Sequence, residues 1–382
     1  MSIRQPKSYI SPLNIRARVQ REQPKGLPVI NLSFNESPYA PNPLVQQAID
    51  STTRCANAYG NPSCELLRSS LAKHNNLDAE TIICGNGSEE LLDIIGRCFA
   101  RPGDDILISE FGYIQFPIVA HRVGANLVKA KESNFTATVD NLLTAVTENT
   151  TILFLANPNN PTGSMISTAE LERLIAELPS QIILVIDLAY GEFADVEYCA
   201  SVHSLAAKVN NVIVTRTFSK AFGLAGLRVG WCHAPAWMIP ILNAARGMGT
   251  VNAVAQAGAM AALETMPHIN NQVQQIVSER QRLSMELTHL GIKVVASHAN
   301  FLMISATHDS ADEPDMRAGR ATHKRADTAA DEFADFLFNE AGFIVNRTRE
   351  SGLESFIRVS LSTPENNNRL LECIKSYLKH CA

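Results

Sequence analysis

Lys220 is the residue whose surroundings most strongly suggest covalent chemistry. It stands in the run Thr217-Phe218-Ser219-Lys220-Ala221, shortly after the apolar stretch 212–214. A lysine between apolar neighbours is unusual unless it is paired or covalently used, because its ammonium group prefers water. A lysine amine can form a Schiff base with an aldehyde cofactor. The segment therefore indicates a nucleophilic lysine.

Acidic, phenolic and amide side chains follow two further apolar runs. Asp187 comes directly after the stretch 182–186, and Tyr190 comes three residues later. The loop 156–163 follows the stretch 151–155, and two prolines make it rigid while its Asn side chains offer directed hydrogen bonds. Taken alone, a carboxylate in this place is more often a cap, and the loop is equally compatible with a structural role.

A glycine-rich turn supplies a candidate phosphate site. The segment Gly85-Asn86-Gly87-Ser88-Glu89 follows the apolar run 81–84 and enters a helix-like stretch. Backbone N–H groups and the helix dipole would favour an anion there. On its own, the segment is better explained as a tight turn with Ser88 as N-cap. It is not a dinucleotide fingerprint, because Glu90 stands where G-x-G-x-x-G requires glycine.

These groups fit one chemistry when they occur together. A lysine that forms a Schiff base, a carboxylate that faces a pyridinium nitrogen, and hydroxyl and glycine-loop donors for a phosphate describe pyridoxal 5'-phosphate binding. Each feature is weak alone, and their occurrence in this order is a strong signal.

The elements that must position these residues have the pattern of an α/β protein. Amphipathic stretches alternate with short apolar runs rich in β-branched residues, which predicts helices packed on a mainly parallel sheet. In such sheets ligands bind beyond the carboxyl ends of the strands, where the residues above stand. The expected strands are 81–84, 105–108, 151–155, 182–186, 212–214 and 227–231.

A second, α+β unit is expected after a long helical stretch from about residue 268 to 290. Its strands are expected near 292–295, 301–304, 343–345 and 356–361, and the polar stretch of about 305–330 is expected to be a surface insertion. The predicted division is an N-terminal arm with a small-domain segment (1–35), a large cofactor-binding domain (36–267) and a small C-terminal domain (268–382).

Composition excludes several classes of protein. The 382 residues are 46% hydrophobic and 19% charged with a net charge of −5, which is typical of a globular chain and gives no reason to expect a nucleic-acid partner. No apolar run approaches the ~18 residues that span a bilayer, so no membrane partner is expected. Eight cysteines without C-x-x-C spacing suggest reduced thiols in a cytoplasmic protein. The basic first 25 residues are expected to form an exposed arm, with a transit peptide as the alternative.

With these motifs in place, the sequence resembles the fold-type I pyridoxal-phosphate-dependent aminotransferases of class I/II, and within them the histidinol-phosphate aminotransferase-like branch. The resemblance implies an aspartate-aminotransferase-like fold, with a seven-stranded, mainly parallel sheet in the large domain and a smaller α+β domain. The matching segments are 35–41, 85–90, 157–163, 187–190, 217–223, 226–230 and 357–360.

The resemblance implies roles for the residues around the cofactor ring. Lys220 would hold the cofactor and move the substrate proton, and Asp187 would keep the ring nitrogen protonated. Asn160 and Tyr190 would hydrogen-bond the phenolate oxygen, and Tyr113 would stack on the ring.

The resemblance also implies a phosphate site that two subunits share. The phosphate would be held around Gly87, Ser88 and Glu89, by the hydroxyls of Thr217 and Ser219, and by Arg228. Tyr59 resembles a tyrosine that this family extends to the partner's phosphate, which implies a homodimer with shared active sites. The alternative is that Tyr59 is a loop residue of its own subunit.

Substrate binding is expected to involve Asn35 and Arg358, and the resemblance makes Arg358 an α-carboxylate clamp. Histidinol-phosphate enzymes usually read I-V-R at the end of the preceding strand, whereas this chain reads Val345-Asn346-Arg347. Either Arg347 replaces that arginine with a shift of one residue, or Asn346 marks a changed pocket.

The function implied is an aminotransferase that moves an amino group between an amino acid or amino-alcohol phosphate, such as histidinol phosphate, and a 2-oxo acid by a ping-pong mechanism. The alternative is a decarboxylase of the threonine-phosphate decarboxylase type, which shares these motifs. A pyridoxal-phosphate-sensing transcription factor would need an added DNA-binding domain, for which roughly 30 preceding residues are too few.

Overall fold

The computed structural model describes residues 24, 26–195, 197–308 and 321–381. The arm expected in the first residues therefore lies mostly outside the described residues.

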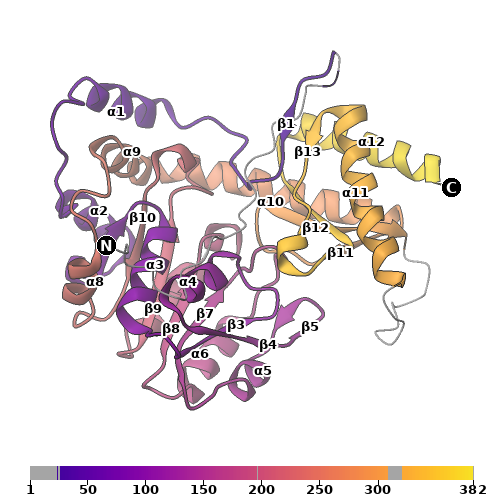
Figure 1. Cartoon of the computed structure of the whole chain (residues 1–382). Helices are drawn as coiled ribbons and strands as arrows, with labels where there is room; N and C mark the ends of the chain where they lie inside the picture. Colours follow the sequence, from indigo (N-terminus) through magenta and orange to yellow (C-terminus); the bar gives the residue numbers. More distant parts are fainter. Residues whose placement is uncertain (1–23, 25, 196, 309–320, 382) are drawn as a thin grey trace, which may run out of the picture.

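A seven-stranded sheet lies at the centre of the larger part of the fold (Figure 1). Its strand order is β2-β10-β9-β8-β7-β3-β4, and all neighbouring strands run parallel except for β10, which is antiparallel to both β2 and β9. The mainly parallel α/β sheet is thereby confirmed. The strands are β2 (Ile82–Gly85), β3 (Asp105–Ser109), β4 (Asn126–Ala130), β7 (Thr150–Ala156), β8 (Ile183–Asp187), β9 (Val212–Thr217) and β10 (Gly230–His233).

Alternate side chains of the central strands enter two different cores, because successive residues of a strand point to opposite faces. In β8, Ile183 and Val185 belong to one core, and Leu184 and Ile186 belong to the other. Both faces are covered by helices, which explains the unbroken apolar runs of the sequence. The helices are α3 (Ser88–Phe99), α4 (Gln115–Val123) and α8 (Ile239–Ala245) on the first face, and α5 (Val139–Thr144), α6 (Thr168–Glu177) and α7 (Tyr198–Ala206) on the second.

The sequence prediction of this sheet was wrong in two places: one expected strand starts too early, and one strand was not expected. The expected strand 227–231 starts too early, because Arg228 has a φ of +57° and β10 begins only at Gly230. A side chain at Gly230 would lie 2.4 Å from the backbone nitrogen of Ser88, so close packing requires glycine there. Strand β4 was missed because it lies at the sheet edge and most of its side chains are exposed, which leaves no apolar run to detect.

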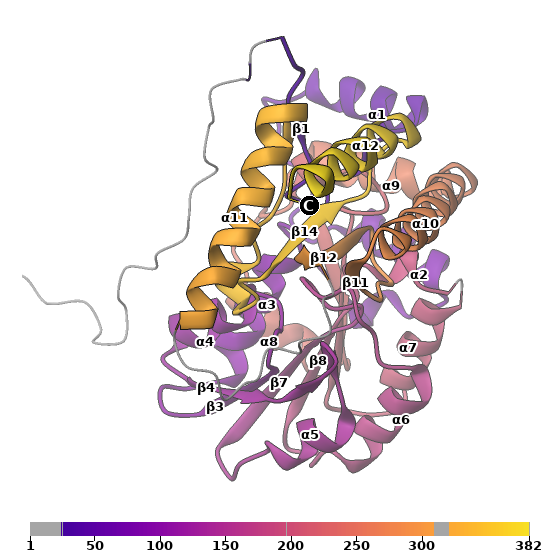
Figure 2. The ribbon, with the colours of Figure 1, turned by 90° about the vertical axis from the view of Figure 1, so that its right-hand side faces the viewer.

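The small domain is built around a three-stranded antiparallel sheet with the order β11-β12-β14. Figure 2 shows α11 and α12 together above the large sheet, with this small sheet between them and α10. The N-terminal strand β1 (Ile30–Asn31) pairs in parallel with β13 (Phe343–Ile344). The proposed boundaries at residues 35 and 267 stay a prediction. The other elements are β11 (Ile292–Val295), β12 (Phe301–His308), β14 (Phe356–Ser360), α10 (Met266–His289), α11 (Ala321–Ala341) and α12 (Pro364–Cys381).

The insertion expected at about 305–330 is wrong at both of its ends. Strand β12 continues to His308, and α11 already begins at Ala321. The start of α11 contains Ala, Lys and Arg, which favour helices without giving an apolar signal. Residues 309–320 lie outside the described residues.

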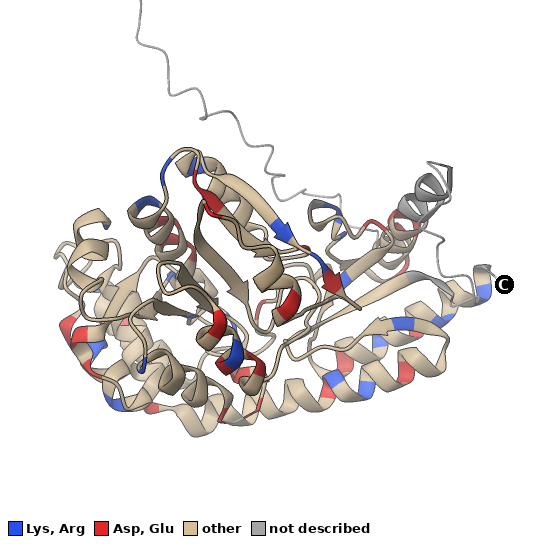
Figure 3. Ribbon diagram, turned by 90° about the horizontal axis from the view of Figure 1, so that it is seen from below, with Lys and Arg blue, Asp and Glu red and all other residues tan. Residues whose placement is uncertain are grey.

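The remaining helices form a layer beside β2 and β10. Helix α9 (Ala253–Glu264) packs against α1 (Pro43–Thr53) and α2 (Glu65–Asn75), and α10 follows α9 in the chain (Figure 1). In the view of Figure 3, lysines and arginines are interspersed with acidic residues along the helices. Among the described residues, no helix is both long and apolar enough to cross a membrane.

Candidate active site

The register of the large sheet brings the expected chemical groups to one edge. Ala156 pairs with Asp187, and Asp187 pairs with Thr215 on the next strand. At the antiparallel strand, Gly230 pairs with both Gly85 and Thr217. The segments that follow β2, β7, β8 and β9 therefore start side by side.

Lys220 lies just beyond the end of β9, facing the segment that precedes α1. Its Nζ donates a hydrogen bond to the Phe34 carbonyl at 2.8 Å and lies 5.8 Å from the centre of the Tyr190 ring. Burial and, to a smaller extent, the nearby Arg358 guanidinium lower the pKa of Lys220 to about 8. At pH 7 about 10% of this amine is then uncharged, far more than for a lysine with an ordinary pKa, and this favours a nucleophilic role.

Asp187 is the last residue of β8 and is buried. The Thr215 hydroxyl donates a hydrogen bond to its Oδ1 at 2.9 Å. Burial raises the pKa of Asp187 to about 6, although this hydrogen bond and one from the Ala189 N–H act in the opposite direction. The sequence reasoning missed Thr215, which could have been found as the residue in register with Asp187 on the adjacent strand.

Asn35 holds the hydroxyl of Tyr190. Its Nδ2 donates to the Tyr190 Oη at 2.9 Å, while its own N–H donates to the Ser360 hydroxyl at 2.9 Å. The Ser360 hydroxyl also lies 3.0 Å from Asn35 Oδ1, as expected for a donor to that oxygen. Because Tyr190 Oη accepts from the amide, its proton remains available to another acceptor. Ser360 was not expected at the site.

The Arg358 guanidinium belongs to strand β14 of the small domain and contacts the same cluster of residues. Its Nη2 donates to the Ser33 carbonyl at 2.6 Å, and its Nη1 donates to Asn160 Oδ1. It lies 5.3 Å above the centre of the Phe301 ring. Asn160 therefore contacts the arginine in this structure, in addition to the cofactor contact expected for it.

Asn346 and Arg347 have different surroundings. The backbone of Asn346 exchanges both hydrogen bonds with Arg358, so their side chains share one face of the pair. Arg347 forms ion pairs with Asp331 at 2.7 Å and Asp335 at 2.5 Å, both on α11. The structure thus places Asn346 beside Arg358, while the described contacts of Arg347 tie it to α11.

The cradle expected for the phosphate includes a close contact between Gly87 and Arg228. Gly87 has a φ of +81° before α3, and a Cβ added there would lie 2.5 Å from Arg228 Nη2. Arg228 Nη1 lies 3.3 Å from the Ser219 hydroxyl, which accepts a bond from the Thr217 hydroxyl at 3.0 Å. Two hydroxyls, a guanidinium and the N-terminus of α3 with Ser88 thus converge, which is a donor set suited to a phosphate.

Glu89 and Tyr113 contact each other beside this cradle. The Tyr113 hydroxyl donates to Glu89 Oε1 at 2.7 Å, and Glu89 Oε2 lies 3.5 Å from Arg228 Nη2. A carboxylate cannot donate a hydrogen bond to a phosphate, so only the backbone N–H of Glu89 suits the expected role. The Tyr113 ring is edge-on to Phe116, with their centroids 5.7 Å apart.

Tyr59 is not part of this cluster within one chain. It lies between α1 and α2, and its side chain is fully exposed.

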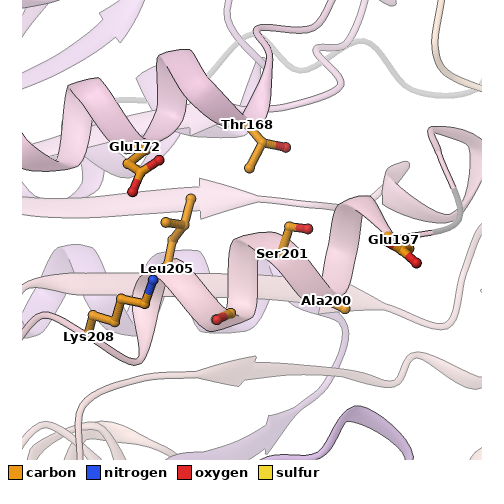
Figure 4. Close-up of a pocket in the computed structure, with 8 residues that line it drawn as sticks. Thr168, Glu172, Glu197, Ala200, Ser201, Leu205 and Lys208 are labelled. Carbon is orange, nitrogen blue, oxygen red and sulfur yellow. The ribbon is translucent and has the colours of Figure 1, made fainter.

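A separate groove lies between α6 and α7 on the second helical face of the sheet (Figure 4). This groove is open to solvent and has a volume of about 510 Å³. Figure 4 shows Thr168 and Glu172 on one side, with Ser201 and Lys208 on the other. None of the expected site residues lines it, so the groove is distinct from the cluster at the sheet edge.

The sequence matches the family model described as aminotransferase class I and II over residues 28–374. The chain belongs to this family. The histidinol-phosphate aminotransferase of Erythrobacter litoralis is 36% identical over 92% of this chain and 91% of the relative. That of Granulibacter bethesdensis is 34% identical over 92% of this chain and 90% of the relative.

Solved structures agree with this family assignment. A histidinol-phosphate aminotransferase from Sinorhizobium meliloti in complex with pyridoxal-5'-phosphate superimposes with a TM-score of 0.81 at 26% identity, covering 92% of this chain and 91% of that one. An aspartate aminotransferase of Thermus thermophilus with maleate shares the fold, with a TM-score of 0.76 at 21% identity over 92% of both chains. The expected aspartate-aminotransferase-like fold is confirmed.

The protein is therefore a pyridoxal-phosphate-dependent aminotransferase, as the motifs and the resemblance predicted. Its described residues fit the cofactor. Asp187 and Lys220 are both shifted toward their uncharged forms by burial. A cationic ring nitrogen beside Asp187 would stabilise its carboxylate. A covalent bond to the cofactor would use the uncharged amine of Lys220. The family and the names of its relatives support transamination over the decarboxylase alternative.

Proposed function

We propose that this aminotransferase moves an amino group between histidinol phosphate, or a closely similar amino-alcohol phosphate or amino acid, and a 2-oxo acid. Both half-reactions would use the same site in turn. One observation carries the proposal: Ser33, Phe34 and Asn35 bind Arg358, Lys220 and Tyr190, respectively. The side chains proposed as anion clamp (Arg358), base (Lys220) and phenol donor (Tyr190) thus all contact the segment 33–35.

Pyridoxal phosphate supplies the electron sink that stabilises negative charge at the substrate Cα. In our proposal Asp187 would pair with its ring nitrogen, while Tyr190 and Asn160 would bind its phenolate oxygen. The cradle of Gly87, Ser88, Thr217, Ser219 and Arg228 would hold its phosphate. The charge and donor type at each position support this assignment.

Lys220 would take the proton from the substrate Cα and return it during the second half-reaction. Its lowered pKa supports this role, because a base with a pKa near the working pH transfers protons in both directions. Arg358 would hold the anionic group of each substrate, and so fix the Cα–H bond toward the lysine.

A set of amino donors tests the proposed substrate. Each donor is mixed with the purified holoenzyme, and the conversion of the bound cofactor to its amine form is followed by absorption. We expect histidinol phosphate to react at least ~10-fold faster than histidinol, because only the phosphate ester offers a strong anion to Arg358. Histidinol is the matched control. A faster reaction with an aromatic or basic amino acid would replace the proposed donor and leave the aminotransferase assignment intact.

We also propose a homodimer in which Tyr59 reaches the phosphate of the partner's site. The full exposure of its side chain supports this role. Heterodimers of a Lys220→Ala subunit and a Tyr59→Phe subunit should regain about half of the wild-type activity, because one of the two sites then has both residues. Differently tagged subunits allow the heterodimer to be purified and assayed against each homodimer. Absence of recovery would show that Tyr59 serves its own subunit.

A further inference from the structure

A buried cluster of charged and histidine side chains surrounds Arg216 on strand β9. Arg216 alternates with Thr215 and Thr217 along β9, so its side chain points to the opposite face from theirs. Arg216 is 6% exposed, and its Nη2 donates to Glu192 Oε1 at 2.5 Å. It also lies 5.6 Å from the Trp231 ring centre. The roles derived above use neither Arg216 nor Glu192.

The hydrogen bonds of the cluster fix its charges. Arg216 Nη1 lies 3.1 Å from His203 Nε2, and an arginine can only donate, so this nitrogen is an acceptor. His203 then carries its proton on Nδ1 and donates to His233 Nδ1 at 3.3 Å. Both histidines are therefore neutral. The charge of Arg216 is left to be balanced by Glu192.

This ion pair ends on the short helical turn that follows Tyr190. Glu192 is the middle residue of η2 (Gly191–Phe193), whose last residue donates its N–H to the Tyr190 carbonyl at 3.0 Å. The Phe193 carbonyl in turn accepts from Arg280 Nη1 at 3.0 Å. The turn is thus held at its centre by Arg216 and at its end by Arg280.

We propose that Arg216 is a positioning residue for Tyr190, which acts by holding Glu192 and thereby the turn η2. The direction of the Tyr190 hydroxyl depends on the backbone at this turn, since Asn35 fixes only one of its hydrogen bonds. The inference rests on the proposed contact between Tyr190 and the phenolate oxygen of the cofactor.

The pH midpoint of the change in visible absorption of the bound cofactor is the readout. Tyr190→Phe should raise this midpoint by about one pH unit, because a phenolate without its donor holds the neighbouring proton more strongly. The double variant Arg216→Met with Glu192→Gln, called the neutral pair, should raise the midpoint by about half a pH unit. In the Tyr190→Phe background the neutral pair should cause no further shift, because the effects of residues that act through one another are not additive. Glu192→Gln alone leaves the buried Arg216 guanidinium without its counter-charge, so it should loosen the turn η2 at least as much as the neutral pair.

Hydrogen exchange in the ligand-free protein gives a second readout. The peptide that spans Tyr190 to Phe193 should exchange about tenfold faster in the neutral pair, since local opening becomes easier. Arg68→Met is the matched control. It removes another partly buried arginine that pairs with a glutamate, and should change neither the exchange at residues 190–193 nor the midpoint.

The possible results separate the two proposals. The positioning role of Arg216 is overturned if Tyr190→Phe shifts the midpoint and the neutral pair does not. It is also overturned if the two shifts add. In both cases the proposed cofactor contact of Tyr190 stands. If Tyr190→Phe leaves the midpoint unchanged, the cofactor contact of Tyr190 fails and the role of Arg216 falls with it. Faster exchange together with a non-additive midpoint shift supports the inference.

Discussion

Lys220→Ala is expected to lower the rate of amino-group transfer by about 10⁴-fold, because a positioned general base contributes up to this factor. Tyr190 and Arg358, which also contact the Ser33–Asn35 segment, cannot replace it, because burial raises the pKa of the Tyr190 phenol and Arg358 does not lose its proton. The rate is measured in single turnovers with saturating donor.

The same variant should lose the visible absorption that bound cofactor shows when it is linked to a lysine. Lys208→Ala is the control, because Lys208 lines the groove between α6 and α7 and should leave both rate and spectrum unchanged. A Lys220→Ala protein that keeps the wild-type spectrum would contradict the covalent role of this lysine.

Arg358→Ala is expected to lower kcat/KM by about 10³-fold for both the amino donor and the 2-oxo acid. Two charge-assisted hydrogen bonds to an anion are worth about 4 kcal/mol together, which corresponds to this factor. The loss should be similar in the two half-reactions, because one arginine serves both substrates. Initial rates over a range of each substrate measure the effect.

Arg347→Ala is the matched control for this experiment. Its guanidinium is held by Asp331 and Asp335, so its removal should change kcat/KM by less than about threefold while lowering thermal stability modestly. A loss as large as that of Arg358→Ala would return Arg347 to the substrate site, as one sequence interpretation held.

The chemistry at the large sheet was predictable because each key residue follows an apolar, β-branched run. Asp187 is the last residue of β8 and Lys220 stands three residues beyond the end of β9, and the parallel order of these strands brings the two together. The family resemblance added functions to these positions. Periodicity could not have supplied those functions, since it reports only burial.

Other features could not be read from local patterns. The contact of Asn35 with Ser360 joins residues 325 positions apart, and no local rule encodes it. The position of Arg228 was misjudged because its left-handed backbone interrupts what the apolar pattern presents as a strand. Arg347 has the residue type expected of a substrate contact, yet the two carboxylates on α11 decide where it points.

The Ser33–Asn35 segment has a consequence for how the enzyme is made. The ribosome adds Arg358 and Ser360 to the chain 325 residues after their respective partners, Ser33 and Asn35. Contacts so distant in sequence form late in folding. A nascent chain can therefore complete much of the large sheet while Arg358 is still missing. The cluster at the sheet edge becomes complete only after the ribosome has added Arg358 and Ser360.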